Sequence, residues 1–144
     1  MSKYDCLRLD HQLCFPIYAC SRGIVKKYKP FLDELDLTYT QYIVMMVLWE
    51  KQECNVKELG NALFLDSGTL TPLLKKMEAK GLVSRTRSTT DERNVIICIT
   101  EEGMKLRDQA VTIPAKMGGC VDLSKDEAKT LYKLLYKVLA NVEK

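Results

Sequence analysis

A cysteine and two tyrosines carry the reactive chemistry that this sequence suggests. Cys14 lies near the start of an amphipathic segment, LDHQLCFPIYACSRGIVKKY (9–28), which ends at Tyr28. Tyr39 follows in LTYTQYIVMMVLWE (37–50), within plausible reach of Cys14 once the chain folds. A thiol attacks peroxides rapidly only as the thiolate, and both a helix N-terminus and hydrogen bonds to the sulfur favour that form. These residues therefore suggest a redox thiol, although packing in a core is the more common use of a cysteine.

The elements that must position these residues follow from capping motifs. Asp10 is expected to cap a first helix that runs to about Tyr28, and Pro30 is expected to end the helical pattern. Thr38-x-x-Gln41 is a capping box that opens a strongly apolar second helix. The thiol and the second tyrosine thus belong to different helices.

The middle of the chain predicts a winged helix-turn-helix. A capping box at 55–58 opens a short helix, and Asp66 can cap a second helix through Lys80. Two β-rich runs, 82–87 and 93–99, flank a polar turn and predict a hairpin. Two short helices joined by a tight turn and followed by a basic hairpin are typical of DNA-binding proteins. The second of these helices would read the DNA.

Small and basic side chains make this helix and the hairpin suitable for DNA. Six basic and three acidic residues lie between Lys75 and Arg93, although charged clusters are usually only a solvated surface. Short side chains let a helix approach base edges, and an arginine at the hairpin tip suits a narrow minor groove, with Asp91 to orient it. The predicted DNA contacts are Ser67, Gly68, Thr69, Thr71 and Pro72, then Lys75 and Lys76 at phosphates, and Arg85, Arg87, Asp91 and Arg93 on the hairpin.

The C-terminal part is predicted to be helical. Thr100 is expected to cap a helix that Pro114 and a flexible Gly118-Gly119 segment interrupt, and a capping box at 124–127 opens the last helix. Apolar residues of the last helix recur at alternating spacings of three and four, which suggests a helical dimer interface. Packing within one subunit explains this stripe equally well. The stripe comprises Ala128, Leu131, Leu134, Leu135, Val138, Leu139 and Val142.

The composition predicts one globular domain in the cytoplasm. The chain has 144 residues, 47% hydrophobic and 28% charged, and its net charge of +3 is too small to indicate a polyanion partner by itself. No apolar run approaches the roughly 20 residues that span a bilayer, and no secretory signal is visible at the N-terminus. The six cysteines contain no C-x-x-C pair, and His11 is the only histidine. We therefore expect reduced thiols, no metal site, no cofactor and no membrane partner.

Two sets of residues resemble a family of bacterial regulators. The segment LFLDSGTLTPLLKKMEAKGLVSRTRSTTDERNV (63–95) resembles the DNA-binding lobe of the MarR family, whose wing motif D-x-R is here Asp91-Glu92-Arg93. The front of the chain resembles the branch that senses organic hydroperoxides, usually called OhrR. The segments that carry this second resemblance are 9–22, 28–32 and 37–50.

The fold expected from both arguments is mainly α-helical with a small β-hairpin wing. The resemblance implies a homodimer formed through the N- and C-terminal helices. A single MarR-like domain, 1–144, would then divide into a helical dimerisation region, 1–36 and 100–144, and a winged helix-turn-helix lobe, 37–99.

The resemblance also implies roles for the reactive residues. Cys14 would be the sensor thiol, and Tyr28 and Tyr39 would donate hydrogen bonds to its sulfur across the dimer interface. Members with two cysteines form an intersubunit disulfide, for which Cys120 is the candidate here. Members with one cysteine are capped by a small thiol, and this alternative stays open.

Three hypotheses for the function follow. The leading one is a repressor that binds double-stranded operator DNA and is released when organic hydroperoxides oxidise Cys14. The second is a related repressor released by a small aromatic or phenolic ligand, with Cys14 incidental. The third is a thiol peroxidase, which fits poorly because a scavenger needs no helix-turn-helix or basic wing. We therefore expect no enzymatic activity.

Overall fold

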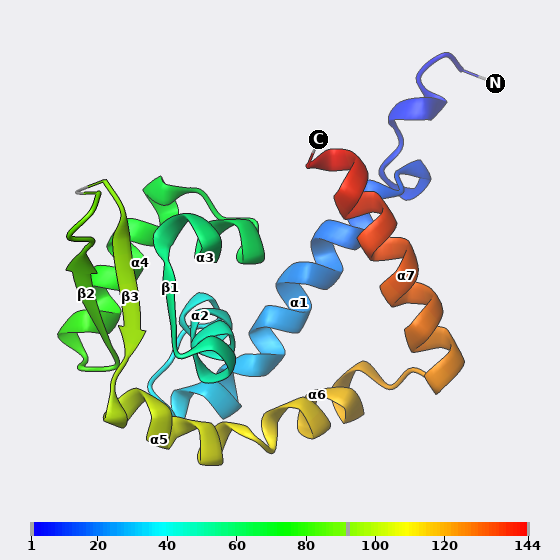
Figure 1. Ribbon diagram of the computed structural model, residues 1–144. Coiled ribbons are helices and arrows are strands. Elements are labelled where there is room, and N and C mark those ends of the chain that lie inside the picture. Colours follow the sequence, from blue (N-terminus) through cyan, green and yellow to red (C-terminus); the bar gives the residue numbers. More distant parts are fainter. Residues whose placement is uncertain (1, 92, 144) are drawn as a thin grey trace. The chain divides into compact units, whose positions relative to one another are not determined.

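The computed structural model describes residues 2–91 and 93–143 and is mainly α-helical (Figure 1). Two 3-10 turns, Asp5–Leu7 and Leu9–His11, come first. The other elements, in chain order, are α1 (Cys14–Asp33), α2 (Tyr39–Lys51), β1 (Glu53–Asn55), α3 (Val56–Leu63), α4 (Ser67–Ala79), β2 (Val83–Arg87), β3 (Val95–Ile99), α5 (Glu101–Ala110), α6 (Ile113–Val121) and α7 (Lys125–Val142). The chain forms two compact units, one up to Thr112 and one from Ile113 onward.

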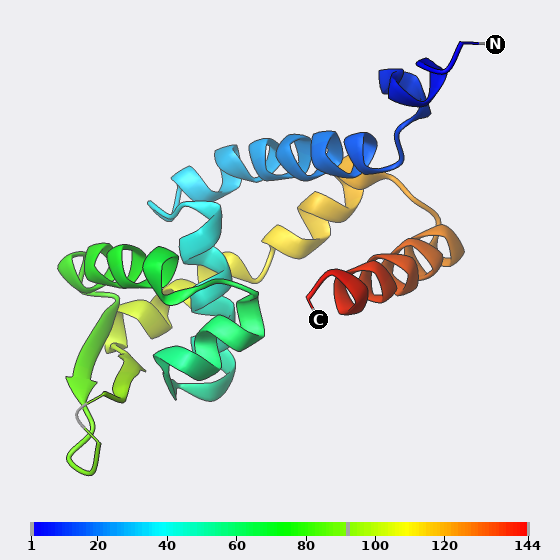
Figure 2. The same ribbon diagram turned by 90° about the horizontal axis from the view of Figure 1, so that it is seen from above.

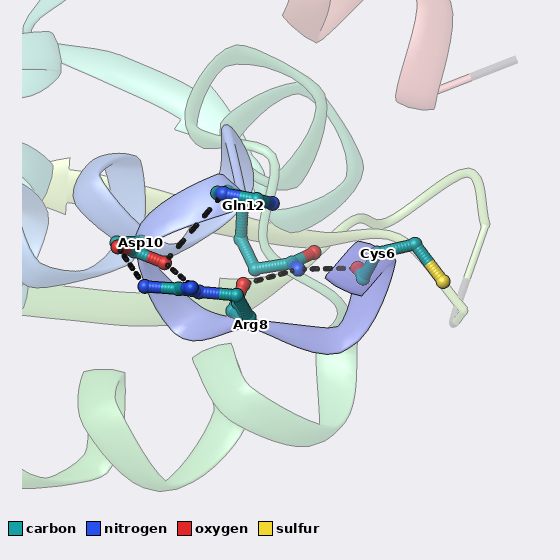
Figure 3. Close-up of polar contacts among 5 residues, drawn as sticks. Cys6, Arg8, Asp10 and Gln12 are labelled. Carbon is teal, nitrogen blue, oxygen red and sulfur yellow. Dashed lines mark hydrogen bonds and ion pairs between the residues drawn. The ribbon is translucent and has the colours of Figure 1, made fainter. Parts of the chain in front are cut away.

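Local polar contacts fold the segment before α1. The Gln12 side-chain amide donates to the main-chain oxygens of Cys6 at 2.8 Å and Arg8 at 2.7 Å. The Arg8 guanidinium binds the Asp10 carboxylate at 3.2 and 3.1 Å (Figure 3). Asp10 thus lies in a 3-10 turn, and the prediction that it caps the first helix is wrong. Helix α1 instead begins at Cys14, after an N-cap residue whose side chain makes no cap hydrogen bond.

The first helix continues past its predicted end. Pro30 lies inside α1, which runs to Asp33. A proline in a helix interior costs about 3 kcal/mol, because it removes a hydrogen bond and its ring crowds the preceding turn. Leu32, Leu35 and Leu37, however, are all buried, and each such burial contributes about 1.5–3 kcal/mol. Burial of these leucines therefore outweighs the local cost of the proline.

The predicted winged helix-turn-helix is present. Thr38 and Gln41 form the reciprocal capping box that opens α2. At the start of α4, the Asp66 carboxylate accepts the Thr69 main-chain N–H at 2.7 Å. Gly81 follows the end of α4 with φ of 78°, a conformation that glycine adopts at little cost. Figure 2 shows α3 and α4 beside the hairpin that forms the wing.

A third strand, not predicted from the sequence, extends the sheet of the wing. β1 pairs antiparallel with β3, which pairs antiparallel with β2, so the strand order is β1-β3-β2. Three residues are too few to show the alternation of apolar and polar side chains that indicates a strand. Residues 53–55 form the strand β1 because they pair with β3. Fully buried core residues lie on the helices and strands around this sheet: Val44, Met45, Leu48, Leu59, Leu70, Leu74, Met77 and Ile97.

The helices after the wing differ from the prediction at one boundary. The helix after the wing ends at Ala110, and the separate helix α6 contains both Pro114 and the Gly118-Gly119 pair. Proline is tolerated in a first helical turn, and glycine weakens a helix without necessarily ending it. The predicted capping box at 124–127 opens α7. None of the described helices has both the length and the apolar character that a membrane-spanning helix needs.

Candidate DNA interface and thiol site

Helix α4 buries one set of side chains and exposes another. Leu70, Leu74 and Met77 are buried at helical spacing. Asp66 fixes the start of the helix, and hydrogen bonds from Thr69 lower the pKa of the Asp66 carboxyl, which keeps this cap ionised. The residues predicted to meet DNA are all exposed on α4: Ser67, Gly68, Thr69, Thr71, Pro72, Lys75 and Lys76.

The tight turn before α4 depends on Gly60 in α3. A Cβ atom at Gly60 would lie 2.6 Å from the main-chain oxygen of Leu65 and 3.3 Å from the Leu70 side chain. The Leu65 N–H donates to the Gly60 oxygen at 3.0 Å, and Phe64 ends α3 in the left-handed region with φ of 57°. Because only glycine permits this close approach, Gly60 helps to set where α4 begins relative to α3.

The tip of the wing is organised by Asp91. Its carboxylate accepts the main-chain N–H of Arg93 at 3.0 Å, and its main-chain oxygen accepts the Asn94 N–H at 2.9 Å. Asp91 therefore orients Arg93 through the backbone, and the Arg93 side chain is exposed. Glu92, the middle residue of the predicted D-x-R motif, lies outside the described residues.

The two arginines of β2 lie in different environments. The Arg85 guanidinium binds the Glu78 carboxylate at 3.2 and 3.3 Å, and its main-chain N–H donates to the same group at 3.3 Å. Only 26% of the Arg85 side chain is exposed. Arg85 thus joins the end of α4 to the wing, a role that the sequence did not reveal. Arg87, at the other end of the strand, is exposed.

Cys14 occupies a position that suits a reactive thiol. It is the first residue of α1, and its side chain is exposed. The N–H groups in the first turn of a helix have no acceptor within the helix, and their combined dipole favours a nearby anion. A thiolate at this position therefore lies where the helix stabilises negative charge.

The two predicted tyrosines belong to a larger aromatic cluster. The ring centroids of Tyr28 and Tyr39 are 4.9 Å apart. Tyr42 lies 5.6 Å from Tyr28 and 6.2 Å from Tyr39, and Trp49 lies 6.2 Å from Tyr42. Burial raises the pKa of the phenols of Tyr28, Tyr39 and Tyr42, so all three keep their protons near neutral pH and can donate hydrogen bonds to an anion. Sequence reasoning missed Tyr42, although its spacing of three from Tyr39 places it on the same helix face.

Within one chain, Cys14 and the tyrosine pair are far apart. Cys14 and Tyr28 both belong to α1, and at about 1.5 Å per residue they are roughly 21 Å apart along its axis. Tyr39 lies against Tyr28 and is equally remote. The hydrogen bonds from Tyr28 and Tyr39 to the Cys14 sulfur, which are expected across a dimer interface, are therefore not made within one chain. A contact between the sulfur and these phenols requires Cys14 of a second chain.

The other cysteines are distinguished by their surroundings. Burial raises the pKa of the thiols of Cys54 and Cys98, and Cys98 also donates to the Glu53 carboxylate at 3.5 Å. Both thiols therefore resist ionisation. Cys120 is exposed in the last turn of α6, and Cys20 is exposed on α1. No group of three or more potential metal ligands occurs within residues 2–91 and 93–143.

Helices α1 and α7 expose apolar side chains. The exposed apolar residues of α1 include Phe15, Ile17, Tyr18, Ile24 and Val25. Helix α7 has no buried residue in the part of the chain that the structure describes. The apolar stripe predicted on α7 is thus accessible within one chain, with Leu131, Leu134, Leu135, Val138 and Val142 all exposed.

Known proteins that resemble this chain are transcriptional regulators. Residues 26–110 match a family described as transcriptional regulator SarA/Rot. The chain is 48% identical over 138 residues to the organic hydroperoxide resistance transcriptional regulator of Bacillus subtilis (strain 168), which covers 96% of this chain and 94% of that protein. The chain belongs to the MarR family of transcriptional regulators. Within that family, it belongs to the branch of organic hydroperoxide resistance regulators.

Solved structures of other proteins have the same fold as this MarR-family regulator. Reduced AbfR bound to DNA matches it with a TM-score of 0.81 and 33% identity, covering 99% of this chain and 100% of that one. Disulfide-formed AbfR matches with a TM-score of 0.70 and 31% identity over 99% and 97% of the two chains. AbfR has been solved from Staphylococcus epidermidis. These matches confirm the winged-helix architecture predicted from the sequence.

Proposed function

We propose that this MarR-family regulator is a homodimeric repressor that binds double-stranded operator DNA and releases it when an organic hydroperoxide oxidises Cys14. The similarity to the Bacillus subtilis regulator, over nearly the whole of both chains, carries the proposal. The exposed thiol at the start of α1 and the small, exposed residues of α4 supply the two parts that such a switch needs.

A second copy of the chain is the proposed cover for the apolar helices. Helix α7 has no buried residue in the described part of the chain, whereas most helical stability in proteins comes from packing an apolar face. Its exposed leucines and valines, together with those of α1, supply such faces. In the proposed dimer, the sulfur of Cys14 accepts hydrogen bonds from Tyr28 and Tyr39 of the partner subunit.

The proposed reaction is a two-electron oxidation of sulfur. The Cys14 thiolate attacks one oxygen of ROOH, the O–O bond breaks, and the departing alkoxide takes up a proton and leaves as ROH. Cys14 becomes a sulfenic acid while the peroxide is reduced to an alcohol. The thiol of Cys120 of the partner subunit then attacks the sulfenic sulfur, so that an S–S bond forms and water leaves. A dithiol reverses the step by thiol–disulfide exchange.

Release of DNA follows from the spacing of the two recognition helices in the dimer. Two recognition helices of a dimer fit half-sites about one helical turn apart, roughly 34–36 Å. A change in the helices that hold the dimer together alters this spacing, so that one recognition helix no longer fits its half-site.

An electrophoretic mobility assay tests the proposal directly. Reduced protein should retard its operator, stoichiometric cumene hydroperoxide should abolish the shift, and dithiothreitol should restore it. The protein should consume about one peroxide per Cys14 and then stop, whereas a thiol peroxidase would turn over. Retardation that is unaffected by complete oxidation of Cys14 would contradict the proposal.

The tyrosine pair should control the speed of oxidation. Tyr28→Phe and Tyr39→Phe are each expected to slow oxidation of Cys14 by about 10- to 150-fold, because a hydrogen bond to a charged group contributes about 1.5–3 kcal/mol. Operator affinity of the reduced protein should stay unchanged. Trapping of the sulfenic acid, followed by mass spectrometry, gives the rate. Tyr4→Phe, in the exposed N-terminal segment, is the control. Equal oxidation rates in all variants would show that Tyr28 and Tyr39 only pack and do not act on the sulfur.

The wing should contribute to operator binding through Arg93. Arg93→Ala is expected to raise the operator Kd about 5- to 150-fold, equivalent to about 1–3 kcal/mol, mainly through A·T-rich steps beside the half-sites. Arg107→Ala, which removes the same charge from an exposed position of α5, is the matched control. Fluorescence anisotropy with operators altered in these flanks measures the effect. Equal losses in the two variants would exclude Arg93 from reading the flanks.

A further inference from the structure

Lys80 connects the end of the recognition helix to the start of α2. It is the C-cap residue of α4, and its ammonium donates to the main-chain oxygen of Asp36 at 2.5 Å and to Gln41 Oε1 at 3.1 Å. The Asp36 carboxylate adds an ion pair at 3.7 Å, but 92% of that side chain is exposed, so solvent screens this part. The contacts to the carbonyl and the amide are therefore the stronger ones.

Gln41 receives Lys80 at the point where α2 begins. The Gln41 residue is only 3% exposed, and its Oε1 also accepts the Thr38 main-chain N–H at 3.1 Å. In return, the Gln41 N–H donates to Thr38 Oγ1 at 3.2 Å. Both acceptor sites of this buried amide oxygen are thus used, one by the helix cap and one by Lys80. Removal of Lys80 leaves the second site without a partner.

The same helix start carries Tyr39, one of the two tyrosines to which the proposed function assigns a hydrogen bond to the Cys14 sulfur. Tyr39 is the first residue of α2, between Thr38 and Gln41. A displacement of Tyr39 therefore acts on the capping box that Lys80 contacts. The group formed by Asp36, Gln41 and Lys80 is called the Lys80 bridge below.

We infer that the Lys80 bridge transmits oxidation of Cys14 to the recognition helix. Oxidation replaces the thiolate that Tyr39 faces, Tyr39 moves with the first turn of α2, and Gln41 pulls on the end of α4 through Lys80. Lys80 and Gln41 are positioning residues in this scheme, because neither contacts the sulfur. The inference rests on the proposed function, since it requires that oxidised Cys14 causes release.

The release ratio, defined as the operator Kd of fully oxidised protein divided by that of reduced protein, tests the inference. Lys80→Met removes the three donors but keeps an unbranched side chain, and it should lower the release ratio to near 1. Lys80→Arg keeps donors and should leave the ratio within about threefold of the wild type. Lys105→Met is the control, because among the described residues this lysine makes only an exposed ion pair with Glu102. Mass spectrometry must show that Cys14 is fully oxidised in every sample.

A role that is merely structural gives a different pattern. In that case, Lys80→Met lowers the thermal midpoint while its release ratio equals that of the wild type, and this result would overturn the inference. Gln41→Met provides a second test if Lys80→Met does not fold, and it should lower the ratio by a similar factor. The release ratio of the Lys80→Met, Gln41→Met double variant should be no lower than that of either single variant, because both changes break the same connection.

Failure of the proposed function can be recognised separately. A wild-type protein that keeps its operator when Cys14 is fully oxidised overturns the proposed function and the inference with it. A wild-type protein that releases DNA, alongside Lys80→Met and Gln41→Met variants that release it equally, overturns the inference alone.

Discussion

The Cys14→Ser variant is expected to bind operator DNA as the wild type does and to stay bound when an organic hydroperoxide is added. A serine hydroxyl preserves the approximate size and polarity of the side chain but forms neither a thiolate nor a sulfenic acid at neutral pH. The exposed position of Cys14 leaves no core to disturb. The wild type should lose affinity about 5- to 150-fold on oxidation, the usual range of coupling between two sites, and the variant should lose none.

The control for this experiment lies on the same helix. Cys20 is exposed on α1, so Cys20→Ser changes the same atoms without touching the helix start. This variant should be released as readily as the wild type in a titration with cumene hydroperoxide. Release of the Cys14→Ser protein by peroxide would show that another residue is the sensor.

Oxidation is expected to join two chains of the wild type covalently, and Cys120→Ser should abolish this product. Cys120 lies in the last turn of α6, and Gly118 and Gly119 precede it in the same helix. Each glycine weakens a helix interior by about 1 kcal/mol relative to alanine, so this end of α6 can unwind at little cost. Unwinding gives the Cys120 thiol the freedom to approach a sulfenic sulfur within bonding distance.

Non-reducing gel electrophoresis after peroxide treatment measures this product. The wild type and Cys20→Ser should run as covalent dimers, and Cys14→Ser and Cys120→Ser should run as single chains. In Cys120→Ser, mass spectrometry should find Cys14 as a sulfenic acid or as a mixed disulfide with an added small thiol. A covalent dimer that persists in Cys120→Ser would assign the second cysteine elsewhere.

Local motifs of the sequence were sufficient to predict most helix starts. The capping box of Thr38 and Gln41, and the cap at Asp66, appear in the structure as predicted. Such caps involve residues three apart, so the chain needs no distant contact to form them. The predicted hairpin was equally local, because two β-rich runs beside a short polar turn pair without help from the rest of the chain.

Where local rules conflict with distant contacts, the sequence misled. Pro30 indicated the end of a helix, but burial of Leu32 carries α1 through it. Asp10 had the chemistry of a cap, but its near neighbour Arg8 binds it in a 3-10 turn, so in this case one local contact replaces another. Three residues of β1 gave no signal, because that strand exists only by pairing with β3.

The candidate site shows the same division. The sequence by itself predicted a redox thiol with two phenols and a winged helix-turn-helix, because residue type, caps and hydrophobic spacing suffice for these predictions. The predicted first helix already contained both Cys14 and Tyr28, and in the structure roughly 21 Å of helix separates them in one chain. Only the tertiary structure joined Arg85 to Glu78 and Lys80 to Gln41. Contacts between α2, α4 and the wing depend on how the elements pack, and no pattern within a single element records that.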